Sequence, residues 1–121
     1  MASIFEATAG KLIGPTTGGT VTQATSKATG VTLNTASGQI TLDDAALAAG
    51  AEVSFAVTNS EIAATDVVVV NHSSAGTAGA YLVQANTIAA GSFAITVANL
   101  SAGSLGEAIV LSFVALKGAS S

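Results

Sequence analysis

The sequence predicts an all-β fold, an antiparallel β-sandwich or jelly-roll-like single domain with one or two short helical turns. Two observations indicate this class. The 121 residues are rich in glycine, threonine and valine and poor in charge pairs at helical spacing, which disfavours long amphipathic helices. Short stretches of alternating apolar and polar residues also recur about every ten residues with turn residues between them, as in sandwiches and small barrels.

Eight strands are expected along the chain. In the stretch VSFAVTN, Val53, Phe55 and Val57 fall on one face of a strand, and small or polar residues fall on the other. The run DVVVVN is apolar on both faces, which favours a central strand covered by a second sheet or by a neighbouring subunit. The predicted strands are Thr20 to Ala24, Val31 to Asn34, Gly38 to Leu42, Glu52 to Thr58, Asp66 to Val70, Ala80 to Asn86, Ser92 to Ala98 and Ala108 to Leu116.

Two connecting pieces favour brief helical turns. Asp43 or Asp44 can cap a turn over Ala45 to Ala49 before Gly50 ends it, and Ser60 can cap a single turn.

A faint repeat with a period of about forty residues is also present. Leu47 to Ser60 is similar to Ile88 to Ser101, and DVVVV is followed by the similar EAIVL at the same spacing. If the repeat reflects a duplication, two similar strand units pack face to face; chance similarity in a low-complexity β sequence is the alternative.

The chain divides into an N-terminal arm at 1–19, a β-sandwich domain at 20–118 and a short solvated tail at 119–121. The arm ends in GPTTGG, whose Gly-Pro and Gly-Gly pairs interrupt regular structure. It forms either a first strand of the core or a contact with a neighbouring subunit or a shell. Its large apolar residues are Ile4, Phe5, Leu12 and Ile13.

Charge is scarce. Only 8% of the residues are charged, against about a quarter in ordinary domains, and the stretch GGTVTQATSKATGVTLN is expected to be a surface whose one charge is Lys27. Such a surface favours a homo-oligomer or a docked particle component, although serine, threonine and asparagine also wet a surface without charge. The three lysines, the absence of arginine and the net charge of −4 argue against nucleic-acid binding.

Compartment and membrane signals are also weak. The chain has no cysteine, so disulfides and thiolate metal sites are excluded. It shows neither a membrane-spanning apolar run nor a leader pattern, so we expect synthesis in the cytoplasm and no membrane partner.

Catalytic signals are weak. His72 is the one histidine and is expected in a loop, while Asp43 and Asp44 are better explained as caps than as a paired-carboxylate site. An enzyme would need a cleft that gathers His72 with an acid such as Asp66. We therefore expect no enzyme, no cofactor and no metal site.

Sugar binding is the best small-ligand alternative, because β-sandwiches often host it. Such sites usually contain exposed aromatic rings, and the chain offers one tyrosine, Tyr81, and no tryptophan. The triplets at Asn71 and Asn99 match the N-glycosylation pattern but are expected to be accidental.

Three segments carry a resemblance to a known group of proteins. GGTVTQATSKATGVTLNTASGQITL, ALAAGAEVSFAVTNS and SAGSLGEAIVLSFVALKGA resemble small structural proteins of tailed bacteriophages, over nearly the whole chain after about Gly18. The resemblance implies a virion β-protein, most plausibly a capsid decoration (cement) protein. It implies a homotrimer on the outer surface of the head that binds the major capsid protein and stabilises the shell. The alternative is a head-fibre or tail adhesin component that binds host surface glycans.

Two residue-level expectations follow. The arm contacts the capsid or a subunit, so a chain lacking residues up to Thr17 should remain folded but not bind capsids. The core is predicted to contain ten residues, with Phe93 or Phe113 facing a subunit interface as the alternative. These are Val53, Phe55, Val57, Val67, Val69, Phe93, Ile95, Val97, Val110 and Phe113.

Overall fold

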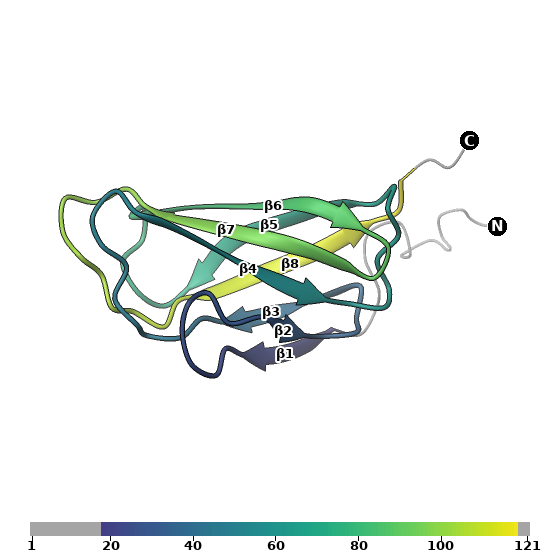
Figure 1. The fold of residues 1–121 in the computed structure, drawn as a ribbon, viewed down its shortest axis with the longest axis horizontal. Helices are drawn as coiled ribbons and strands as arrows, with labels where there is room; N and C mark the ends of the chain where they lie inside the picture. The colour runs from purple at the N-terminus through teal and green to yellow at the C-terminus, as the bar shows by residue number, and fades with distance from the viewer. Residues whose placement is uncertain (1–17, 119–121) are drawn as a thin grey trace.

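Two four-stranded sheets face each other across an apolar core in the computed structural model, which describes residues 18–118 (Figure 1). One sheet has the strand order β1-β3-β8-β5 and the other the order β2-β4-β7-β6. The strands are β1 (Gly19–Thr22), β2 (Val31–Thr32), β3 (Ser37–Thr41), β4 (Glu52–Thr58), β5 (Val67–Ser74), β6 (Tyr81–Ala89), β7 (Ser92–Asn99) and β8 (Val110–Leu116).

The predicted all-β sandwich is confirmed, and each of the eight predicted strands overlaps an observed one. Both sheets are mixed, because β1 pairs with β3 and β2 with β4 in parallel, while the remaining pairs are antiparallel. The parallel pairs arise because the chain crosses between the sheets in its first three strands. β1 and β3 lie in one sheet, and β2 lies in the other.

The helical turns predicted after β3 and β4 are wrong, since residues 18–118 contain no helix. Asp43 does act as a cap, because its carboxylate accepts the Ala45 N–H at 2.8 Å. The chain stays extended because Leu47 and Leu105 exchange backbone hydrogen bonds of 2.8 and 3.0 Å. After β4 the turn is organised by Asn59 rather than by Ser60.

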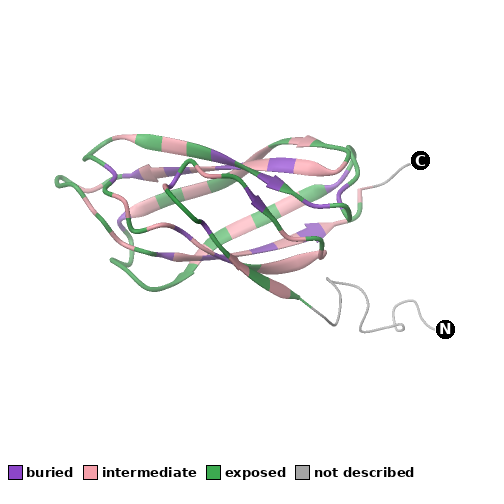
Figure 2. Ribbon diagram, turned by 60° about the horizontal axis from the view of Figure 1, so that its bottom comes forward, coloured by how far each residue is buried: buried purple, intermediate pink, exposed green. Residues whose placement is uncertain are grey.

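The core is built from the inward-facing residues of both sheets, and the alternation of burial along the strands is visible in Figure 2. Phe93 of β7 and Phe113 of β8 meet between the sheets with ring centroids 5.5 Å apart. Neither ring faces a subunit interface, so that alternative is wrong. Six of the ten predicted core residues are buried: Phe55, Val57, Phe93, Ile95, Val97 and Phe113.

Two of the other four predicted core residues are exposed. Val67 and Val69 are 55% and 49% exposed, whereas Val53 packs partly buried against the core and Val110 is also partly buried. The prediction of a central strand for DVVVVN is wrong, because β5 is an edge strand paired only with β8. One face of β5 therefore packs inward through Val68 while the other face points outward.

The repeated segments lie side by side rather than face to face. β4 pairs with β7 in one sheet and β5 pairs with β8 in the other, so each similar unit spans both sheets. Asn59 and Asn99 follow the same pattern, since each is fully buried and accepts a backbone N–H from two residues ahead at 2.9 Å. This shared geometry supports a duplication of the strand unit.

The two ends of the sandwich differ. Gly18 and Gly118 lie at the right-hand end of Figure 1, and the loops at 42–51, 75–80 and 100–109 form the opposite end. The eight strands contain one acidic or basic residue, Glu52, at the first position of β4. The flat sides of the sandwich are therefore almost free of formal charge.

Candidate functional site

The four predicted contact residues of the arm, Ile4, Phe5, Leu12 and Ile13, lie outside the described residues. The search for a site within residues 18–118 therefore rests on the loops and on the outer faces of the sheets. Three features stand out: a buried lysine, a hollow beside the one histidine, and the distribution of charge over the surface.

Lys27 is 3% exposed, so the expected surface charge is in fact buried. Its ammonium group donates hydrogen bonds to the backbone carbonyls of Asp43, Ala45 (2.7 Å) and Glu107 (2.8 Å). Burial lowers the pKa of Lys27, and the nearby acids Asp43, Asp44 and Glu107 oppose that shift. The lysine thus joins three loops at one end of the sandwich.

Gln23 extends this arrangement, and it is also buried. Its amide nitrogen donates to the carbonyls of Lys27 and Thr29 at 2.9 and 3.0 Å, and its amide oxygen accepts the Asp43 N–H at 2.9 Å. All three ammonium hydrogens of Lys27 are used by backbone carbonyls, so these polar residues have a structural role. The single charge in a neutral segment was the sequence signal for this position, but its burial could not be read from the pattern.

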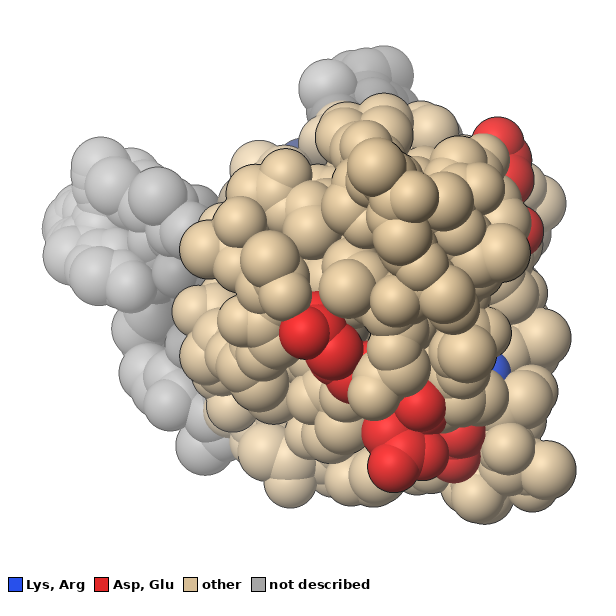
Figure 3. Space-filling view, turned by 90° about the vertical axis from the view of Figure 1, so that its left-hand side faces the viewer, with Lys and Arg blue, Asp and Glu red and all other residues tan. Residues whose placement is uncertain are grey.

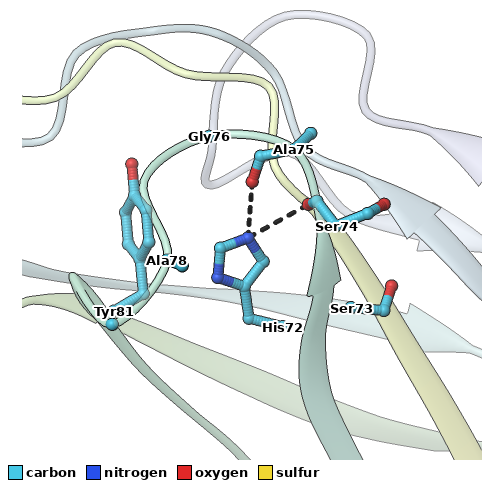
Figure 4. Close-up of a pocket in the computed structure, with 8 residues that line it drawn as sticks. His72, Ser73, Ser74, Ala75, Gly76, Ala78 and Tyr81 are labelled. Carbon is cyan, nitrogen blue, oxygen red and sulfur yellow. Dashed lines mark hydrogen bonds between the residues drawn. The ribbon is translucent and has the colours of Figure 1, made fainter.

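A hollow of about 220 Å³ lies beside His72 and Tyr81, between the end of β5 and the following loop (Figure 4). His72 belongs to β5 rather than to a loop, and its Nε2 atom lies 3.0 Å from the Ser74 carbonyl oxygen and 2.6 Å from that of Ala75. Its ring meets that of Tyr81 edge to face at a centroid distance of 5.5 Å. The histidine thereby supports the turn in which Ala75 has a φ of 63°.

Glu107 holds the other side of this loop. Its carboxylate accepts hydrogen bonds from the Thr77 N–H (2.9 Å), the Thr77 hydroxyl (2.8 Å) and the Tyr81 hydroxyl (2.8 Å). The bonds from Thr77 and then Tyr81 lower the pKa of Glu107. Burial first, and Glu107 second, raise the pKa of Tyr81 to about 12. Gly76 must lack a side chain here, because its φ is 74° and a Cβ atom would lie 2.7 Å from Glu107 Oε1.

Tyr81 should therefore report on this contact. We expect Glu107→Gln to move the pKa of Tyr81 from about 12 toward, but not down to, the ordinary value near 10. The removed charge is only the smaller cause, and burial of the ring remains. Because Tyr81 is the one tyrosine, tyrosinate absorbance during an alkaline titration measures its pKa alone. Asp44→Asn, which removes an exposed acid from the same end, is the control, and an unchanged Tyr81 pKa in Glu107→Gln would contradict the contact.

The pH dependence of stability has a defined sign at each group. The raised pKa of Tyr81 stabilises the fold below the unfolded value of about 10, and this contribution is lost as pH rises from there through about 12. The lowered pKa of Glu107 stabilises the fold above its unfolded value, and that contribution is lost as pH falls through the folded value.

The candidate catalytic groups are not brought together. Asp66 and His72 stand six residues apart along one strand, about 20 Å at the usual rise. Asp66 pairs instead with Lys117 at 2.7 Å, and this contact lowers the pKa of Asp66. Residues 18–118 contain no cluster of three or more His, Cys, Asp or Glu side chains that could hold a metal ion. The same part of the chain has no helix long and apolar enough to cross a membrane.

Formal charge gathers at the loop end of the sandwich. Asp43, Asp44 and Glu107 belong to the loops there, Glu52 begins the adjoining strand, and Figure 3 looks onto acidic side chains amid a neutral surface. The outer face of the β2-β4-β7-β6 sheet is composed largely of alanine, serine and threonine. Ser54 and Thr96 share a 2.7 Å hydrogen bond across it. The surface with functional potential is thus a broad neutral side rather than a catalytic cleft.

Comparison with protein-family profiles, with curated proteins and with solved structures finds no match to this chain.

Proposed function

We propose that the chain is a structural protein of a phage particle, a decoration protein that binds the outer surface of the head as a homotrimer and stabilises the shell. The phage origin rests on the resemblance of its three segments to small structural proteins of tailed phages. The observation that carries the structural role is the separation of charge. Seven of the eight strands have no acidic or basic side chain, and the acidic residues occupy the loops and one strand end.

A neutral side suits a protein that spends its working life against neighbours. Interfaces bury polar and apolar surface in similar proportions, and charged groups are depleted at their centres because desolvating a charge is costly. In a shell, each weak contact is repeated many times, so modest affinity per copy is enough to stabilise the particle. The proposed partner is the major capsid protein on the outside of the head, and the proposed role needs neither a cofactor nor catalysis.

The arm supplies the proposed contact with the shell. Aspartate at Ile4 and Phe5 of the full chain should weaken binding to heads stripped of this protein at least tenfold, because burying a new carboxylate in an apolar contact is costly. The matched control places aspartate at Ala7 and Thr8, which adds the same charge to the same arm. Co-sedimentation measures binding, and the melting temperature of the heads measures stabilisation.

Three outcomes would count against the proposal. Unchanged binding by the Ile4 and Phe5 variant would remove the arm from the contact. A full chain that stays free of heads would remove the decoration role. Saturable binding to host surface glycans by that free chain would instead establish the head-fibre or tail adhesin alternative.

A further inference from the structure

The exposed large apolar side chains of the described residues concentrate on one flank. Four are exposed, and three of them belong to β5 and β6: Val67, Val69 and Leu82 at 55%, 49% and 54%. The fourth, Leu100, lies in the loop after β7. β5 and β6 lie close together at corresponding edges of the two sheets without pairing. We call the outward-facing residues of these two strands the β5–β6 flank.

On β5 the exposed valines extend into a larger aliphatic surface. Val67 lies opposite Leu116 and Val69 opposite Val114 in the antiparallel register with β8. Directly opposite residues of such a pair point to the same face, so the four side chains form one patch on the outside of the sheet. A shallow hollow of about 220 Å³, lined by Val69, Val114 and neighbouring polar residues, indents this patch.

The flank also lacks the usual protection of a sheet edge. Natural edge strands are guarded by charges, prolines, bulges or short length. The two edges at the opposite side are short, with four residues in β1 and two in β2. β5 is eight residues long and has neither charge nor proline, and its register shift falls between His72 and Ser74. The segment from Val67 to Asn71 is therefore a regular, uncharged edge.

The surroundings of the patch indicate what kind of partner fits. The charges next to it, Asp66 and Lys117, already pair with each other at 2.7 Å, so the rim offers no unpaired charge to a charged partner. The partner surface must be neutral and partly aliphatic. The flat sides of this chain have that character, because Leu82 and the alanines of the β2-β4-β7-β6 sheet lie on an outer face whose one charge is Glu52.

From these observations we propose that the β5–β6 flank packs against a second copy of this chain, with the two sandwiches side by side. The proposal rests on the homo-oligomer in the proposed function and names its subunit surface. A stable interface buries about 800 Å² per partner, more than four aliphatic side chains supply. The contact must therefore include the exposed polar residues of the same strands, Asn71 and Gln84 among them.

Charge insertion tests the flank. In the full chain, lysine at Val67 and Val69 should weaken self-association at least tenfold in sedimentation velocity over a concentration series. The control is lysine at Thr20 and Thr22, two exposed β-branched residues on β1 at the opposite edge of the same sheet, and it should associate like the wild type. Melting curves of both variants verify that each is folded.

A second measurement does not depend on charge. Since the chain has no cysteine, Val69→Cys carries one thiol, and its reaction with a maleimide should slow at least tenfold as the protein assembles. Thr20→Cys should react at the same rate throughout. Equal behaviour of the Val69 and Thr20 variants, or a wild-type chain that remains a monomer, would overturn the inference. Oligomers that assemble through the flank but do not bind heads would contradict the decoration role alone.

Discussion

Replacing Lys27 with methionine is expected to lower the free energy of unfolding by about 4 kcal/mol. Methionine has a similar volume, so the core contacts of the alkyl chain are largely kept. The loss comes from the carbonyls of Asp43, Ala45 and Glu107, which would be left without their donor in a buried place. Three loops would lose their common anchor at once. Equilibrium denaturation with urea measures the change.

The matched control is Lys117→Met. Lys117 is 66% exposed, and its partner Asp66 keeps the backbone N–H of Ala63 at 2.9 Å, so this loss should be about 1 kcal/mol. A loss at Lys27 no larger than the loss at Lys117 would show that the buried hydrogen bonds contribute little.

Replacing Asn99 with alanine is the second large effect, with an expected loss of about 3 kcal/mol. Asn99 is fully buried, and its amide donates to the carbonyls of Leu47 (2.8 Å) and Gly103 (2.9 Å). Its oxygen accepts the N–H and the hydroxyl of Ser101. Alanine leaves these groups unpaired and creates a small cavity. A thermal melt or urea titration measures the change.

Asn71→Ala provides the comparison, because Asn71 lies on the exposed face of β5 and a loss within about 0.5 kcal/mol is expected there. If both asparagines tolerated alanine equally, the loops at this end would not depend on Asn99.

The alternation of apolar residues was enough to locate the strands, because period-two patterns such as that of β4 depend only on which face is buried. It was not enough to order them. The run of four valines looks the same in a central strand and in an edge strand whose outer face is covered only after assembly, so β5 was placed wrongly. The parallel pairs also escaped prediction, since crossovers between sheets leave no local signature.

The candidate site was less predictable than the fold. A lysine among threonines and serines looks solvated, and nothing local indicates that three distant carbonyls surround Lys27. The roles of Asn99 and Glu107 likewise depend on loops far along the chain, such as the contact of Glu107 with Thr77. The absence of paired catalytic groups was easier to anticipate, because a single histidine leaves few combinations to consider.

The position of the chain ends gives the molecule a direction. The chain enters at Gly18 and leaves at Gly118 at one end, and the far end consists only of loops. Gly103 in one of these loops has open space around it, so an inserted peptide there would project away from both points of attachment. A fusion at the C-terminal side would instead emerge beside the arm. The fold thus offers two opposite outlets for displayed cargo, one next to the proposed anchor and one remote from it.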